Sequence, residues 1–137
     1  MTKFKIGLWI GLAVLLAALA GWIFGWSSTS SLRTELAAKS LRLQLLEART
    51  QILDARVNVY TVNFGNASRH LEYSKPPLEA ASNGLKADSK VDLSQKLDQA
   101  VAFVNEAQQL AVKFSQDANS RAGDAARLID EVLAATR

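Results

Sequence analysis

Hydrophobic positions divide the chain into one uninterrupted apolar run, residues 6–26, and a longer region in which apolar and polar positions alternate with helical period. The run contains no charged side chain. A helix of this length, rising about 1.5 Å per residue, would cross the roughly 30 Å hydrocarbon core of a bilayer. Tryptophan and lysine side chains favour the two membrane interfaces. The pattern predicts a transmembrane helix over 6–26, with interface anchors Lys3, Lys5, Trp9, Trp22 and Trp26.

Charge asymmetry around the run predicts its orientation. Lys3 and Lys5 precede it, and no acidic residue occurs before Glu35. By the positive-inside rule, residues 1–5 are expected in the cytoplasm and everything after the run on the periplasmic side of a bacterial-type inner membrane. The alternative is a cleaved signal peptide, recognised at Ala18-Leu19-Ala20. The run stays apolar beyond that pattern, which favours a retained anchor.

Small residues recur along the predicted membrane helix at nearly helical spacing. Such a stripe lets another helix backbone approach closely, so it predicts packing against a partner helix, from either a second copy or another subunit. Glycine is also common in membrane helices in general, and this alternative stays open. The stripe consists of Gly7, Gly11, Ala18, Gly21 and Gly25.

The pattern of apolar and polar residues after the run predicts an all-α domain outside the membrane. Residues 27–31 form a polar collar, and residues 32–137 show apolar series expected to form helices at about 32–62, 64–86, 90–117 and 120–136. The second helix is expected to break at Pro76-Pro77, because proline lacks an N–H and restricts the residue before it. Short connections favour antiparallel neighbours, so we expect an antiparallel three- or four-helix bundle with a long first helix.

The first of these helices is apolar on most of its circumference. With Leu36 as heptad position a, positions a and d carry one apolar series, and positions c and f carry a second one. One small bundle can cover only one face of a helix, so the surplus predicts contact with another protein. We expect the partner-facing surface to include Leu41, Leu45, Ile52 and Val59 with Arg42, Arg49 and Arg56.

The three arginines occupy position g, and two acids, Glu47 and Asp54, occupy position e. In a parallel two-stranded coiled coil, Arg42 would pair with Glu47 of the second chain, and Arg49 with Asp54. A solvated charged row is the alternative interpretation. We favour the solvated row, because a bare dimer would leave positions c and f uncovered.

The segment Asn63-Phe64-Gly65-Asn66-Ala67-Ser68-Arg69-His70-Leu71 resembles the start of the second helix of a tetratricopeptide-type hairpin. The resemblance implies a helical hairpin with a protein-interaction surface. Upstream, Asn58 stands where that family has an aromatic residue. The pattern does not recur at a 34-residue period, which argues against a repeat array.

Composition narrows the candidate chemistry. The chain has 137 residues, no cysteine and one histidine, His70, so disulfides and thiolate chemistry are excluded and a histidine-rich metal site is not expected. Apart from Lys3 and Lys5, the chain has 14 basic and 13 acidic residues, so the two charges nearly balance. The sequence shows no basic patch of the kind that would predict nucleic-acid binding. No motif predicts a catalytic residue, a metal site or a cofactor.

These patterns predict a non-catalytic, single-pass accessory or structural subunit that binds and stabilises a larger membrane protein complex. The host could be a photosynthetic, respiratory, transport or envelope assembly. The expected partners are other membrane subunits, with a homodimer as the alternative, together with membrane lipid and no small-molecule substrate. Two other functions stay open: a periplasmic helical-bundle sensor or ligand-binding module, and a homo-oligomeric coiled-coil stalk.

Overall fold

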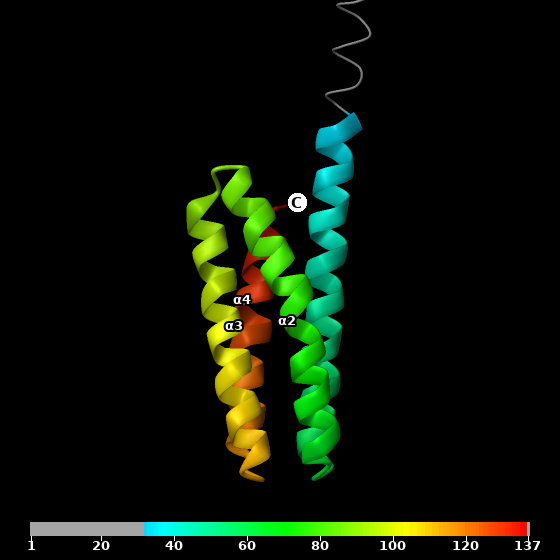
Figure 1. Ribbon diagram of the computed structural model, residues 1–137, viewed down its shortest axis with the longest axis vertical. Helices are drawn as coiled ribbons and strands as arrows, with labels where there is room; N and C mark the ends of the chain where they lie inside the picture. The colour runs from blue at the N-terminus through cyan, green and yellow to red at the C-terminus, as the bar shows by residue number, and fades with distance from the viewer. Residues whose placement is uncertain (1–31, 137) are drawn as a thin grey trace, which may run out of the picture. The chain divides into compact units, whose positions relative to one another are not determined.

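The computed structural model describes residues 32–136, which are all-α with four helices (Figure 1). The first helix covers 32–60, and α2 (Phe64–Ala87), α3 (Val91–Val112) and α4 (Asp117–Ala135) follow. This confirms the prediction of an all-α chain with bundle-like packing. The predicted membrane helix 6–26 and collar 27–31 lie outside the described residues. Between 32 and 136, no helix combines the length and apolarity needed to cross a bilayer.

The chain divides into two compact units, Met1–Ala37 and Ala38–Arg137. In the first unit, the structure describes residues 32–37, which are helical and exposed. The second unit is the bundle, in which short turns join consecutive helices. α3 packs against both α2 and α4. Side-chain hydrogen bonds also join the helix 32–60 to α2, between Gln51 and His70, and to α4, from Arg49 to Asp130.

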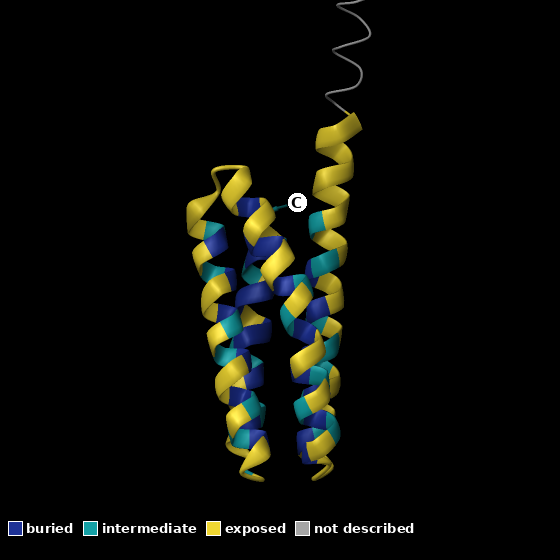
Figure 2. Cartoon of the chain, viewed as in Figure 1, coloured by how far each residue is buried: buried dark blue, intermediate teal, exposed yellow. Residues whose placement is uncertain are grey.

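The bundle core is rich in alanine. Buried positions occur on all four helices (Figure 2). Each helix contributes fully buried alanines beside leucine, isoleucine or valine. Small side chains allow helix backbones to approach closely, while the larger ones fill the space between the layers. The buried alanines are Ala48, Ala55, Ala67, Ala81, Ala100, Ala107, Ala111, Ala118, Ala122, Ala125 and Ala126.

Helix α2 continues through Pro76 and Pro77, where the sequence predicted a break. The two prolines provide no N–H for the carbonyls of Glu72 and Tyr73, four residues earlier. Glu72 and Tyr73 are exposed, so water can bond the freed carbonyls. Leu71 and Leu78, on either side of the prolines, are both fully buried. Burial of this apolar face outweighs the lost backbone bonds.

Each of the three turns ends its helix with the same backbone motif. Val62, Ser89 and Phe114 adopt left-handed φ values of 62°, 60° and 58°. Around each, one backbone N–H bonds a carbonyl five residues earlier, as in Asn63 N to Asn58 O at 2.7 Å, which defines a Schellman motif. The left-handed Phe114 ends α3 at Val112, earlier than the predicted residue 117. Helix α4 then begins at Asp117, three residues before its predicted start.

Candidate protein-binding surface

Between Leu41 and Val59, the helix 32–60 turns its c and f positions into the core of its own bundle. Leu45, Ile52 and Val59 are fully buried; Leu41 is partly buried against the main core that holds Leu45 and Ile52, and Val59 lies in a second, smaller cluster. This corrects the expectation that these four side chains face a partner. Between residues 38 and 62, every c and f position is apolar, whereas the a and d series contains Lys39 and Thr50. The uninterrupted face forms the core, since a buried lysine would lose its hydration.

Two of the three expected partner-facing arginines fasten the helix 32–60 to α4. Arg49 Nε donates to Asp130 Oδ1 at 2.6 Å, and Arg56 Nε donates to Asn119 Oδ1 at 2.9 Å. The Arg56 guanidinium lies beside Gly123, where a β-carbon would be 3.5 Å from Arg56 Cζ. Arg42 alone remains exposed and makes no such bond within the described part of the chain.

The opposite face of this helix exposes a row of large apolar side chains, which we call the exposed row. It comprises Leu43, Leu46, Leu53, Val57 and Tyr60, at positions a and d of the heptad. Leu43, Leu46, Val57 and Tyr60 are 68%, 40%, 62% and 80% exposed, and Leu53 is half-buried. A row of exposed large apolar side chains of this kind is typical of a protein-binding site. Sequence analysis found both apolar faces but expected the c and f side chains, which the structure buries, to be the ones that face a partner.

Thr50, Arg42 and Glu47 are polar side chains that lie within or beside the exposed row. Thr50, which interrupts the row, donates its hydroxyl to the Leu46 carbonyl at 2.9 Å. Its polar group would therefore not lose a hydrogen bond if the row were covered. Arg42 and Glu47 flank the row and are both exposed. No ion pair engages either of them within residues 32–136, so both charges are available to a partner.

Three groups of hydrogen-bonded polar side chains, which we call the polar clamps, join α3 to α2 and to α4. Lys75 Nζ donates to Glu72 Oε2 at 2.7 Å, and Gln108, from α3, donates to the same carboxylate at 2.9 Å. On α3 itself, Asp98 accepts from Ser82 at 2.6 Å and from Lys86 at 3.2 Å. The third clamp joins α3 to α4 through Lys96 and Glu131 at 2.6 Å.

These clamps lower the pKa of all three carboxyl groups. The Lys75 hydrogen bond has the largest effect on the pKa of Glu72, the Ser82 hydroxyl on that of Asp98, and the Lys96 hydrogen bond on that of Glu131. A carboxyl group whose pKa is lower in the folded chain stabilises the fold at pH values above its ordinary pKa. That stabilisation is lost as the pH falls through the lowered pKa.

We therefore expect the bundle to unfold at a lower urea concentration at about pH 3 than at about pH 6. Far-UV circular dichroism of the full chain in detergent would measure the midpoints. Asp98→Asn should reduce the difference between the two midpoints, because its side chain no longer titrates. An unchanged midpoint across this range would contradict the assigned clamps.

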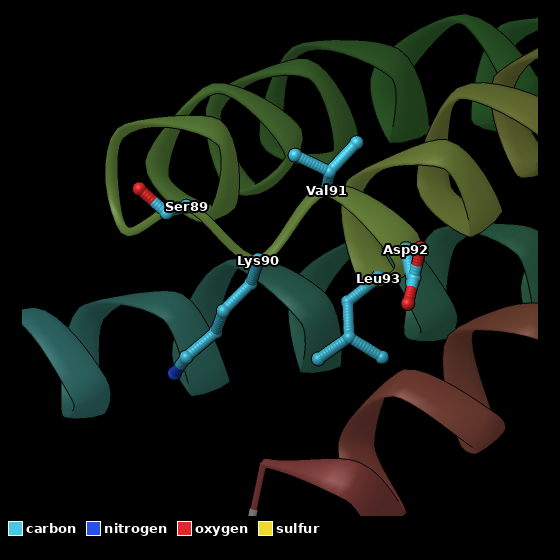
Figure 3. A pocket seen from close by; sticks show the side chains of 5 residues that line it. All are labelled: Ser89, Lys90, Val91, Asp92 and Leu93. Carbon is cyan, nitrogen blue, oxygen red and sulfur yellow. The ribbon is translucent and has the colours of Figure 1, made fainter.

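Small-molecule sites receive little support from the surface of the bundle. One depression of about 370 Å³ lies at the turn between α2 and α3 and is lined by Ser89, Lys90, Val91, Asp92 and Leu93 (Figure 3). In this view the side chains of Lys90 and Leu93 extend to one side of the turn and that of Val91 to the other. A second depression of about 400 Å³ lies along the end of α3.

Buried polar side chains in the described part of the bundle are already hydrogen-bonded, to backbone carbonyls or to other side chains. Across residues 32–136, no buried side-chain nitrogen or oxygen lacks a hydrogen-bond partner. His70 Nδ1 lies 2.8 Å from Gln51 Oε1, so the only histidine of the chain joins α2 to the helix 32–60. The described residues contain no group of three or more acidic or histidine side chains that could hold a metal ion.

Comparison with known proteins identified no related protein. The chain matches no protein-family model, no curated protein and no solved structure. The resemblance of residues 63–71 to a tetratricopeptide hairpin therefore stays a prediction.

Proposed function

We propose that this chain is a non-catalytic, single-pass accessory subunit that binds and stabilises a larger assembly at the membrane. The exposed row on the helix 32–60 carries the proposal. A bundle that needed no partner would place polar side chains at these positions, because exposed leucine and tyrosine bring no folding benefit and favour association. The row therefore favours protein binding as the function of the bundle.

The membrane location rests on the apolar run 6–26. Its length, its preceding lysines and its terminal tryptophans are those of a membrane anchor. We propose that residues 1–5 stay in the cytoplasm and that the bundle lies on the other side of a bacterial-type inner membrane. The small-residue stripe from Gly7 to Gly25 is proposed to pack against another membrane helix, but it lies outside the described residues.

The two tyrosines of the chain allow a matched cross-linking experiment in native membranes. Tyr60 lies in the exposed row and Tyr73 on α2, and both are exposed. p-Benzoyl-phenylalanine, a photo-reactive analogue of similar shape, would replace each in turn in the full chain. We expect irradiation to give a discrete protein adduct from position 60 and none from position 73.

A clear result would settle the role of the row. If position 60 gave no adduct in its native membrane, the exposed row would not be a protein-binding surface and the proposed function would fail. The ligand-binding alternative gains no specific support, since the depressions at both ends of α3 lack converging, unpaired polar groups.

A further inference from the structure

We propose that the exposed row binds a second copy of this chain, forming a parallel two-stranded coiled coil between two bundles. This inference rests on the part of the proposed function that assigns the row to protein binding, and it leaves contact with a larger assembly to other surfaces of the chain. It adds the identity of the partner, the direction of its helix and the residues that pair across the interface.

The structure removes the main objection to such a dimer. A bare pair of helices would leave the apolar c and f positions in water. In the bundle those positions are covered by the chain's own helices, as the full burial of Leu45, Ile52 and Val59 demonstrates. On an α-helix, the a and d stripe lies roughly opposite the c and f stripe. One face can therefore build the bundle while the other meets a second chain.

The side chains of the row match the requirements of a two-stranded coiled coil. Leu46, Leu53 and Tyr60 occupy position d, and Leu43, Thr50 and Val57 occupy position a. Leucine at d with a β-branched residue at a, as at Leu53 and Val57, favours two strands over three or four. The Thr50 hydroxyl is bonded to the Leu46 carbonyl, which removes the cost of burying it at the seam.

Charge complementarity favours a second copy in parallel orientation. In a parallel pair, the residue at g lies beside the residue at e five positions later in the other chain. This places Arg42 beside Glu47 of the second copy, and twofold symmetry repeats the pair. Both side chains are exposed and have no ion-pair partner in their own bundle, whereas Arg49 is already bonded to Asp130.

The seven-residue phase of the row also continues upstream in the sequence. Gly11, Ala18 and Gly25 precede Leu32 at intervals of seven; Lys39 interrupts the series at the next step, and Leu46, Leu53 and Tyr60 resume the same phase. Residues 11–25 lie outside the described residues, so only their spacing counts here. Small residues in this phase are compatible with a close second helix in the membrane. Two copies inserted with the same orientation would also present their rows in parallel.

Cysteine cross-linking can test the pairing directly, because the chain has no cysteine of its own. Leu43→Cys and Val57→Cys each place a thiol at position a, about 21 Å apart along the helix. In a parallel, in-register dimer, each variant alone would form a disulfide with its own copy on mild oxidation in membranes. In an antiparallel pair, at most one of the two variants could form a disulfide with its own copy. Ala102→Cys, on the exposed side of α3, is the control and should give no dimer.

Charge exchange tests the predicted ion pair in the Val57→Cys background. Arg42→Glu places two acids beside each other, and Glu47→Arg places two basic groups there, so each should reduce the dimer yield about tenfold at low salt. The double variant restores opposite charges across the interface and should recover most of the yield. A destabilised bundle would not recover in this way, so the recovery separates pairing from folding.

The photo-adduct from position 60 distinguishes failure of this inference from failure of the proposed function. An adduct of twice the chain mass, together with self-cross-linking of both cysteine variants, supports the dimer. An adduct with a different protein, and no self-cross-linking, overturns the dimer and leaves the proposed function standing. No adduct of any kind overturns both. Self-cross-linking of only one cysteine variant overturns the parallel register.

Discussion

Ile52→Ala should lower the free energy of unfolding of the bundle by about 2–5 kcal/mol. Ile52 is fully buried in the main core, so truncation removes apolar contact and leaves a cavity that the surrounding helices only partly close. Since domains of this size are stable by only about 5–15 kcal/mol, the loss would be a large fraction of the total. The change would also fall on the face that sequence analysis assigned to a partner.

Urea unfolding of the full chain in detergent, followed by far-UV circular dichroism, would measure this effect. Indole fluorescence would not serve, because all three tryptophans lie within residues 6–26. Leu43→Ala on the exposed row is the matched control, measured at a protein concentration low enough to prevent association. It should change the free energy of unfolding by about 0.5 kcal/mol or less. If Leu43→Ala cost more than Ile52→Ala, the two faces would be wrongly assigned.

Ala107→Leu should destabilise the bundle by about 1–3 kcal/mol although it adds apolar surface. Ala107 is fully buried on α3, in the same core as Ile52. Extra methylene groups in an alanine-lined core would force neighbouring side chains out of their preferred rotamers or push the helices apart. Burial of extra apolar surface would by itself stabilise the bundle, whereas we expect destabilisation. The measured change in stability therefore reports on how tightly the core is packed.

Ala102→Leu provides the control on the same helix. Ala102 is exposed, and leucine and alanine both favour helix, so the urea midpoint should hardly change. Equal midpoints for Ala107→Leu and the unmodified chain would mean that the helices are packed more loosely than the alanine-rich core indicates.

The positions of the helices could be predicted from the sequence, because apolar periodicity is a local property of the chain. The apolar series located all four helices, and the first two of the three turns fell close to the expected residues. The errors lay at the ends and at the prolines. Nothing near Phe114 signals a left-handed residue, because glycine normally takes that position. Pro76 and Pro77 indicated a break, yet α2 continues because its apolar face is buried on both sides of them.

Sequence alone determined that the first helix carries two apolar faces with charged residues between them. Only the tertiary structure decided which face is inside. Heptad periodicity is a local property that is present on both faces and interrupted on one of them only at Lys39 and Thr50, whereas burial depends on how side-chain volumes match three other helices. The partners of Arg49 and Arg56 lie 81 and 63 residues away along the chain, on α4. No local pattern specifies such contacts, so Arg42 could be separated from the other two arginines only in the folded bundle.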